Sequence, residues 1–494
     1  MALGTLIDTR PNEEGQAWER ELGAASMPLP AGYRPRSPEG TVLHRVVREN
    51  LESFLAEARE RSEHGFGLPR FVEEEFREYI ACGVLSRGFM RIRCEGCGDE
   101  SFVGFSCKRR GICPSCTARR AVDGAAHLVD AVIPSVPTRQ WVLTFPVKLR
   151  WVFARRPAFA GRALGIFLRA LATFQRQRAR VLGVDGSAKG GAITFVQRFN
   201  SALGLNIHFH VVTPDGVFTA DDDGKGATFH RVPAPRDGVV EDLLKKVAVR
   251  VVRMLRRELS DGDDDNLDAL GALEAAALKP TSTTRTKGDP PPKKLTAFLE
   301  GFSLHAGVHL HENDRLGLER LCRYGARGAI AHSRLEELPD GRVSYHMKRP
   351  LPDGRTHLVM TGMELLRKLA PLVPPPRINL LRFHGVFAPN AKLRHLVVPK
   401  PPEPTPTCKP TPEPAEAPAS PREPSPYRLD WAAALKRVFG TEIFDCPRCG
   451  GRLTVIAFIE KASAVKAILD HLGLPSVPLP LGKARGPPQL AIAW

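Results

Sequence analysis

Two histidines stand one residue apart in an otherwise apolar run, "LNIHFHVVTPDGVF", which extends from Leu205 to Phe218. Alternate side chains of a β-strand point to opposite faces, so His208 and His210 would share one face with Asn206. The Pro-Asp-Gly turn that follows is typical of a strand end. Imidazoles placed side by side in this way bind a metal ion, form hydrogen bonds in a core, or lie at the surface.

An amide side chain is expected beside this pair. "AITFVQRF" and "LNIHFHVV" can form a hairpin around residues 200–205, and its register would place Gln197 opposite His208 on the same face. Two imidazoles and an amide oxygen suit Mg²⁺ or Mn²⁺ and leave coordination positions open for phosphate oxygens. His208, His210 and Gln197 are therefore predicted to hold a catalytic divalent cation.

A rival pair, His309 and His311, occurs in "HAGVHLHEND". It directly precedes a predicted helix, a position typical of a strand end at the surface. His305 belongs to the same predicted strand and is an alternative third ligand for the cation of His208 and His210.

A tyrosine lies among arginines in the predicted helix "DRLGLERLCRYGARG", residues 314–328. One side of this helix carries a stripe that can pack on a sheet, formed by Leu318, Leu321, Cys322 and Gly325. The other side carries Arg320, Arg323, Tyr324 and Arg327. Such a cluster is common on surface helices. Opposite a metal site, however, Tyr324 is a candidate nucleophile, because guanidinium groups and a metal-bound phosphate favour ionisation of a phenol whose ordinary pKa is about 10.

Two Cys-X-X-Cys pairs occur in "CEGCGDESFVGFSCKRRGICPSC", residues 94–116. Paired knuckles of this kind usually hold one tetrahedral zinc ion, because each tight turn supplies two thiolates. The predicted ligands of one structural zinc are Cys94, Cys97, Cys113 and Cys116, with Cys107 and Cys82 as further candidates. Free or redox-active thiols are the alternative. The adjoining "KRRG" and "ARRA" make the module basic and suggest that it contacts DNA.

A further pair, Cys446 and Cys449 in "FDCPRCGGRL", resembles half of a zinc ribbon. No second Cys-X-X-Cys follows it, so these thiols could bind metal only with other ligands or across a dimer.

The charge of the chain indicates a polyanionic partner. The 494 residues include 71 Lys and Arg against 54 Asp and Glu, which gives a net charge of +17 and a pI of about 9.7. The sequence shows neither an apolar run long enough to span a membrane nor a signal-peptide pattern. We therefore expect a cytoplasmic, bacterial-type protein associated with the nucleoid, whose ten cysteines are metal ligands or thiols. The absence of a GxxxxGK[ST] motif argues against an ATP-driven motor.

Composition and periodicity divide the chain into five regions. A disordered arm is expected over residues 1–40, and a helical and zinc-binding domain over 41–135. The catalytic domain is predicted to span residues 136–398, with an acidic and proline-rich surface insertion at about 220–298. A proline-rich linker, 399–426, would separate it from a small C-terminal region, 427–494.

The order of these motifs resembles the rolling-circle transposases of the insertion-sequence ninety-one and common-region type. These belong to the HUH endonucleases, in which U is a hydrophobic residue. The resemblance runs from about Tyr79 to Val398. It rests on the zinc knuckles and on "RQWVLTFP", "TFVQRFNSALGLNIHFH", "SLHAGV", "GLERLCRY" and "LLRFHGVFAPNAKLR".

The resemblance implies a metal-dependent enzyme that nicks and rejoins single-stranded DNA at the ends of its own element. His208, Phe209 and His210 match the HUH motif, and Tyr324 matches the tyrosine that becomes joined to the 5′ end of the nicked strand. Some relatives carry a second tyrosine four residues earlier, where this chain has Arg320, so a single-tyrosine enzyme is implied. Arg320, Arg323 and Arg327 would then position the DNA backbone.

The implied fold class is α+β, with a mainly antiparallel sheet backed by helices and an N-terminal helical zinc-binding module. Two other functions share part of this pattern. A plasmid replication initiator or relaxase would use the same nuclease chemistry on other DNA. A non-enzymatic zinc-finger DNA-binding protein would need only the zinc and the positive charge.

Overall fold

A six-stranded antiparallel sheet lies at the centre of the computed structural model, in the strand order β13-β4-β5-β3-β9-β8. The structure describes residues 37–62, 65–258, 294–351, 353–400, 437 and 444–485. The strands of the central sheet are β3 (Thr138–Thr144), β4 (Gly191–Phe199), β5 (Leu205–Pro214), β8 (Thr296–Leu299), β9 (Phe302–Leu310) and β13 (Leu381–Gly385). The expected α+β class with a mainly antiparallel sheet is confirmed.

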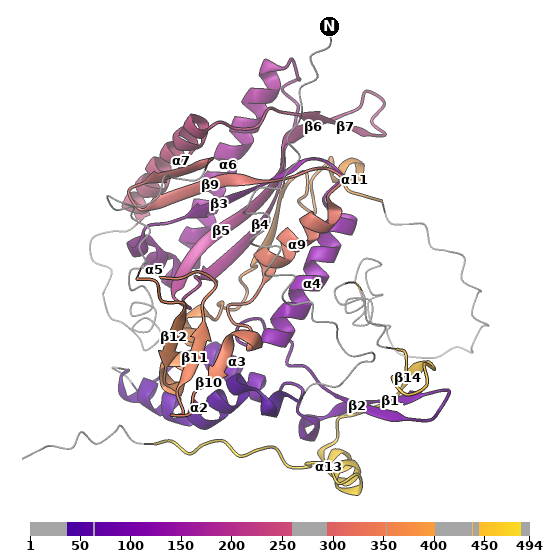
Figure 1. Cartoon of the computed structure of the whole chain (residues 1–494). Coiled ribbons are helices and arrows are strands. Elements are labelled where there is room, and N and C mark those ends of the chain that lie inside the picture. Colours follow the sequence, from indigo (N-terminus) through magenta and orange to yellow (C-terminus); the bar gives the residue numbers. More distant parts are fainter. Residues whose placement is uncertain are drawn as a thin grey trace, which may run out of the picture.

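One face of this sheet is apolar and is covered by long helices (Figure 1). Trp141 and Leu143 of β3 and Phe209 and Val211 of β5 join one core cluster with Phe167. The helices that contribute to this cluster are α5 (Val147–Arg155), α6 (Pro157–Val181) and α7 (Asp237–Glu258). Period-two alternation along β5 therefore places the apolar odd-numbered residues beneath these helices.

The opposite face is covered by α4 (Pro114–Ala131) and α9 (Arg315–Ala326). Phe195 of β4 and Val212 of β5 pack there with Leu128 of α4 and Leu321 of α9 in a second core cluster. The even-numbered residues of β5, including both histidines, lie on this face. The catalytic candidates therefore lie between the sheet and α9.

The N-terminal helices pack against a late part of the chain. α2 (Val42–Glu60) and α3 (Arg70–Ala81) share the larger core cluster with a three-stranded sheet and α10 (Gly362–Leu369). The strands of this small sheet are β10 (Leu335–Glu337), β11 (Val343–His346) and β12 (His357–Met360). Arg367 of α10 also pairs with Glu57 of α2, with Nη2 and Oε2 2.5 Å apart. The predicted zinc-binding and catalytic regions thus share one core.

The predicted surface insertion at about 220–298 is shorter than expected. Residues 237–258 form α7, whose apolar side is buried against α6, and residues 296–299 form β8 at the edge of the central sheet. A hairpin of β6 (Gly216–Ala220) and β7 (Ala227–Arg231) precedes them. The remaining candidate insertion, 259–293, lies outside the described residues. The same holds for residues 1–36 of the predicted arm and for the predicted linker beyond residue 400.

The C-terminal region is joined to the N-terminal module by a shared sheet. β14 (Leu453–Ile459) pairs with β1 (Phe89–Cys94), which pairs on its other side with β2 (Glu100–Gly104). Figure 1 shows the yellow β14 beside the purple strands β1 and β2, with α13 (Ala462–His471) below them. The expected separate C-terminal region is corrected here: its described part completes a sheet begun more than 350 residues earlier. Among the described residues, no helix is long and apolar enough to cross a membrane.

Candidate active site and cysteine centres

The histidine pair lies on β5 as predicted, directly against β4. Gln197 is the register partner of His208, which confirms the predicted hairpin. The imidazole centroids of His208 and His210 are 4.9 Å apart, and both residues are buried, with 8% and 6% of their surface exposed.

Each imidazole is held through its Nδ1 atom. His208 Nδ1 is 2.8 Å from the backbone oxygen of Asn206, and His210 Nδ1 is 3.3 Å from Oε1 of Gln140. Because a carbonyl oxygen only accepts, both Nδ1 atoms are assigned the proton, which leaves each Nε2 with a lone pair. Histidine ligands of metals are usually oriented by such a bond from the other ring nitrogen. The donor set therefore fits a divalent cation.

Both imidazoles are neutral at physiological pH. Burial lowers the pKa of His208 to about 4, and the charges of Arg150 and Arg327 act in the same direction. Burial also lowers the pKa of His210 well below its ordinary value, as do the neighbouring His208 and the cations Arg327 and Lys348. Protons therefore do not compete for the free Nε2 atoms, and a cation could bind these nitrogens without displacing a proton from either of them.

Gln197 is attached to the end of the tyrosine helix. Its Nε2 donates to the backbone oxygens of Tyr324 and Gly325, each at 3.0 Å. Two carbonyl acceptors fix the amide nitrogen toward α9, so the amide oxygen points away from them. Gln197 thus couples β4 to the C-terminal end of α9. Its role as a metal ligand stays a prediction.

Tyr324 lies over the histidine pair, with its ring centroid 5.9 Å from that of His210. A glycine permits this approach. A Cβ atom on Gly325 would lie 2.7 Å from the ring of Phe195, and Phe195 is the register partner of His210. The apolar stripe of Leu318, Leu321, Cys322 and Gly325 is buried, as predicted. Packing of this stripe on the sheet therefore presents Tyr324 to His210.

Cations surround the phenol ring of Tyr324. The guanidinium carbon of Arg327 is 4.8 Å from the ring centroid, and Nζ of Lys348 is 4.3 Å from it. Burial alone would raise the pKa of Tyr324, but Arg327, Lys348 and Arg349 together lower it below its ordinary value. The site therefore favours a phenolate.

The three arginines expected to bind DNA separate into two environments. Arg327 contacts the tyrosine ring, whereas Arg323 lies among the charges of Glu319, Arg320 and Arg437. The structure therefore brings Arg327 to the candidate nucleophile. The DNA-binding roles of Arg320 and Arg323 stay predictions.

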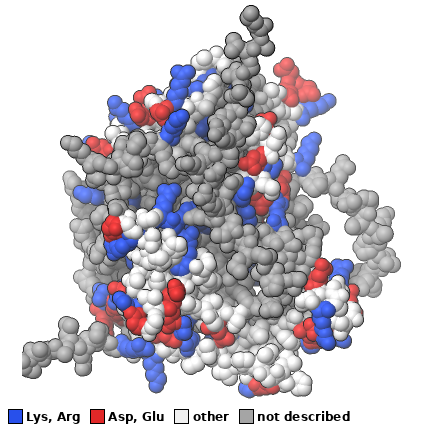
Figure 2. All heavy atoms as spheres, viewed as in Figure 1, with Lys and Arg blue, Asp and Glu red and all other residues white. Residues whose placement is uncertain are grey.

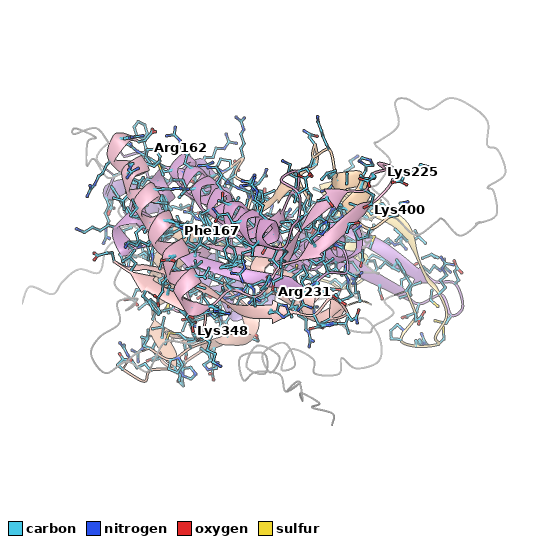
Figure 3. All side chains as sticks on the ribbon, turned by 90° about the horizontal axis from the view of Figure 1, so that it is seen from above. Arg162, Phe167, Lys225, Arg231, Lys348 and Lys400 are labelled. Carbon is cyan, nitrogen blue, oxygen red and sulfur yellow. The ribbon has the colours of Figure 1, made fainter. Side chains whose placement is uncertain are left out.

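Sequence reasoning missed two cations at this site. Lys348 follows β11 in a segment without a motif, and Arg150 lies on α5 with only 2% of its surface exposed. Arg150 donates from Nε to the backbone oxygen of Phe145 at 2.7 Å, and burial lowers its pKa to about 10. It therefore remains charged near His208. Viewed from above, Lys348 and Arg162 of α6 lie at opposite sides of the body, with Phe167 between them (Figure 3).

The rival histidines do not form a paired site. His309 is the register partner of Arg139, on the face opposite His210, and its Nε2 lies 3.4 Å from Oδ2 of Asp215. Arg139 binds the same carboxylate through two nitrogens, at 2.9 and 2.7 Å, so Asp215 is committed to a buried ion pair. His311 lies beyond the end of β9 and is exposed.

His305 lies on the same face as His210 but two strands away. Val142 of β3 pairs with both residues, which puts His305 about 10 Å from His210 along the sheet. Its Nδ1 is 2.8 Å from Oγ1 of Thr296. This spacing favours Gln197, the direct neighbour of His208, over His305 as a third ligand.

The cysteines form two groups, and the expected grouping around one zinc is corrected. Cys113 and Cys116 lie with Cys82 and Cys107, whereas the pair Cys94 and Cys97 lies elsewhere, with Cys446 and Cys449. In the first group the Sγ atom of Cys116 is 3.7 Å from that of Cys82 and 3.5 Å from that of Cys107. The reason is structural: the first turn of α4 packs against the end of α3, while Cys94 and Cys97 lie at the tip of a separate hairpin.

Glu75 holds the loop that joins Cys107 to Cys113. Its carboxylate accepts backbone N–H bonds from Arg110, Gly111 and Ile112, at 3.0–3.3 Å. Arg110 in turn donates to the backbone oxygens of Pro375 and Ile378. This arginine of the "KRRG" segment therefore attaches the knuckle to the body of the protein.

Two family models match the chain. One, described as a transposase zinc-binding domain, matches residues 49–145, and the other, described as a putative transposase, matches residues 191–394. The first spans the cysteine group of Cys82 and Cys116, and the second spans His208, His210 and Tyr324. Comparison with curated proteins and with solved structures produced no match.

Proposed function

Because the chain belongs to the transposases of the insertion-sequence ninety-one type, we propose that it nicks and rejoins single-stranded DNA at the ends of a mobile element. The observation that carries this proposal is the position of Tyr324. Its ring lies 5.9 Å from that of His210, beside two neutral imidazoles whose Nε2 atoms are free of the bonds that hold Nδ1. The proposed nucleophile on α9 thus packs directly against the proposed metal-binding pair on β5.

His208 and His210, with Gln197, would hold a Mg²⁺ or Mn²⁺ ion. A divalent cation bound there supplies a Lewis acid that polarises the scissile phosphate and offsets the charge that develops on it. Gln140 and the backbone of Asn206 orient the two imidazoles for this task. Two neutral nitrogens and an amide oxygen leave the charge of the cation available to the phosphate.

Tyr324 is the proposed nucleophile. Its phenolate oxygen would form a bond to the scissile phosphorus while the bond from phosphorus to the 3′ oxygen breaks. The products are a 5′-phosphotyrosine and a 3′-hydroxyl, and the proton that the phenol gives to water is balanced by one that the 3′ oxygen takes up. Attack by a 3′-hydroxyl on the phosphotyrosine reverses these changes, so strands are joined without ATP.

Positive side chains would hold the DNA in the site. Arg327 and Lys348 flank the phenol, and the charge of Arg150 acts on His208 from the α5 side. Together they would bind the phosphodiester backbone and favour the phenolate, whatever the base sequence.

The surface charge of the described chain supports a nucleic-acid partner. α6 contains no acidic residue, and its exposed side carries Arg162, Arg169, Arg176 and Arg180. On the face shown in Figure 2, Lys and Arg are interspersed with Asp and Glu over the part that is described. α6 is therefore one element that contributes positive charge without acidic residues of its own, although Arg162 pairs with Glu258 of α7.

The proposal is tested by looking for a covalent adduct between the protein and single-stranded DNA. The full-length protein is incubated with Mg²⁺ or Mn²⁺ and labelled single-stranded oligonucleotides from both ends of its element, and the products are separated under denaturing conditions. We expect a protein–DNA adduct that Tyr324→Phe abolishes, because this change removes only the phenolic oxygen.

Tyr345→Phe is the matched control. Tyr345 is buried, with 2% of its surface exposed, so this variant should still form the adduct. An adduct that persists in Tyr324→Phe and maps to another residue would contradict the proposal. Cleavage of plasmid origin DNA in preference to the element's ends would instead indicate a replication initiator or relaxase, and binding without cleavage would indicate a DNA-binding protein alone.

A further inference from the structure

We propose that the chain holds a second zinc ion, bound by Cys94 and Cys97 of the N-terminal module together with Cys446 and Cys449 near the C-terminus. The four Sγ atoms all lie within 4.8 Å of one another. The Sγ atoms of Cys94 and Cys449 are 3.5 Å apart, and those of Cys97 and Cys446 are 3.7 Å apart. Thiolates about 2.3 Å from a tetrahedral zinc are separated by about 3.8 Å, so the observed spacing fits this ion.

The two halves of the centre have the same local structure. In each, the backbone N–H of the glycine after the second cysteine bonds to the carbonyl of the first: Gly98 to Cys94 at 3.0 Å, and Gly450 to Cys446 at 2.8 Å. Both glycines have a φ of 72°, which is the left-handed region. Two equivalent Cys-X-X-Cys-Gly knuckles thus face one another, as four-thiolate zinc sites require.

The sulfur atoms are also packed as a ligand shell. Backbone N–H groups point at them: Cys97 N is 3.5 Å from Sγ of Cys94, and Gly451 N is 3.3 Å from Sγ of Cys449. A Cβ atom on Gly451 would lie 3.1 Å from the sulfurs of both Cys94 and Cys449. N–H donors favour thiolates, and the glycine leaves room for the backbone to pass close to them.

A shared sheet brings the two knuckles together. β1 and β14 pair from Phe89–Ile459 to Cys94–Leu453, and Glu95 N bonds to the backbone oxygen of Arg452 at 2.9 Å. Among the described residues, the buried core at this point consists of Ile92, Cys94, Cys446 and Leu453, with Met90 and Val103 partly buried against them. So small a core contributes little to stability, and metal binding is the usual way in which such a ribbon is stabilised.

This four-cysteine centre, Cys94, Cys97, Cys446 and Cys449, is called the clasp below, because it links residues that are 355 positions apart in the sequence. The four thiols of the clasp form a group distinct from that of Cys82, Cys107, Cys113 and Cys116. Cys94 and Cys97 lie within the segment matched as a zinc-binding domain, whereas Cys446 and Cys449 lie outside both matched segments. Zinc in the clasp would hold the C-terminal segment on the N-terminal module. Zinc binding at the clasp is independent of the proposed nuclease activity.

The first test counts zinc in the full-length protein. We expect two zinc ions per chain, and one in Cys94→Ser, in Cys446→Ser and in the variant that combines these two changes, because both cysteines serve the same ion. Combining Cys94→Ser with Cys113→Ser should instead remove both ions. Cys408→Ser, which changes a cysteine of the proline-rich segment, is the matched control and should retain two. One zinc in the wild type, or the loss of two ions from Cys94→Ser with Cys446→Ser, would overturn the shared centre.

The second test asks whether zinc holds the C-terminal segment. A specific protease site is introduced between residues 400 and 426, the chain is cut, and the fragments are separated by gel filtration. We expect the fragments to co-elute with zinc bound and to separate after chelation, or when Cys446 and Cys449 are both replaced by serine. Fragments that separate with zinc present, or that stay together in the double variant, would overturn the clasp.

Discussion

At the scale of single residues, the proposed active site depends on the charge placed around one phenol. Lys348 lies 4.3 Å from the centroid of the Tyr324 ring and helps to lower the pKa of that tyrosine. Lys348→Met removes this cation, so the pKa rises and less phenolate is present at neutral pH. A nearby positive charge stabilises the phenolate more than the neutral phenol, so we expect adduct formation at pH 7 to slow by on the order of fivefold and to recover as the pH rises. The measurement is the rate of adduct formation against pH. The control is Lys225→Met, which changes an exposed cation far from Lys348 in Figure 3 and should leave the dependence of the rate on pH unchanged. An unshifted pH dependence in Lys348→Met would contradict the role of Lys348 in lowering the pKa of Tyr324.

At the scale of elements, the distance between α9 and β4 decides where the tyrosine lies. A Cβ atom on Gly325 would lie 2.7 Å from the Phe195 ring, so Gly325→Ala must push α9 away from the sheet. Overpacking of this kind costs about 1–3 kcal/mol, and a nucleophile displaced by about 1 Å can lose about 100-fold in rate. We expect the variant to fold with a lower melting temperature and to form adduct at least about tenfold more slowly. Phe195→Leu should restore part of the rate in the Gly325→Ala background, because the smaller side chain makes room. Wild-type rates in Gly325→Ala would show that this contact does not position the nucleophile.

At the scale of the whole molecule, the described C-terminal segment packs against elements that lie far from it in the sequence, without supplying a residue of the proposed active site. β14 pairs with β1, and Arg437 binds Asp130 of α4 at 3.0 Å and Glu319 of α9 at 2.8 Å. A chain that ends at Pro399 should still nick single-stranded DNA, because His208, His210 and Tyr324 are all retained. It should lose one zinc ion, and proteases should cut residues 89–104 much faster, because β1 has lost a partner strand. Nicking assays and limited proteolysis measure these outcomes. A folded truncated chain without nicking activity would show that the C-terminal segment belongs to the catalytic unit.

Local pattern was enough to predict the histidine pair and its direct neighbour on β4. Alternation along β5 and a short hairpin determine that Gln197 and His208 share a face, since a slip of one residue would turn the histidines toward α5, α6 and α7 and remove apolar residues from that core. The stripe that ends at Gly325 likewise determines which side of α9 presents Tyr324. The stripe of α7, which includes Leu244, Val247 and Val251, was also present in the sequence, but the adjoining acidic and proline-rich segments obscured it.

Only the tertiary structure decided which cysteines lie together and which cations surround the phenol. Any Cys-X-X-Cys knuckle can complete a tetrahedral site with any other, so the nearer pair in sequence, Cys113 and Cys116, was the obvious partner for Cys94 and Cys97. The entropic cost of closing a loop grows only slowly with its length, so a separation of 355 positions does not prevent Cys449 from reaching Cys94. The position of Lys348 beside Tyr324 was also decided by tertiary structure, because it is determined by how β11 packs on distant helices. Periodicity describes the face of one element, whereas contacts between remote elements depend on the packing of the whole chain.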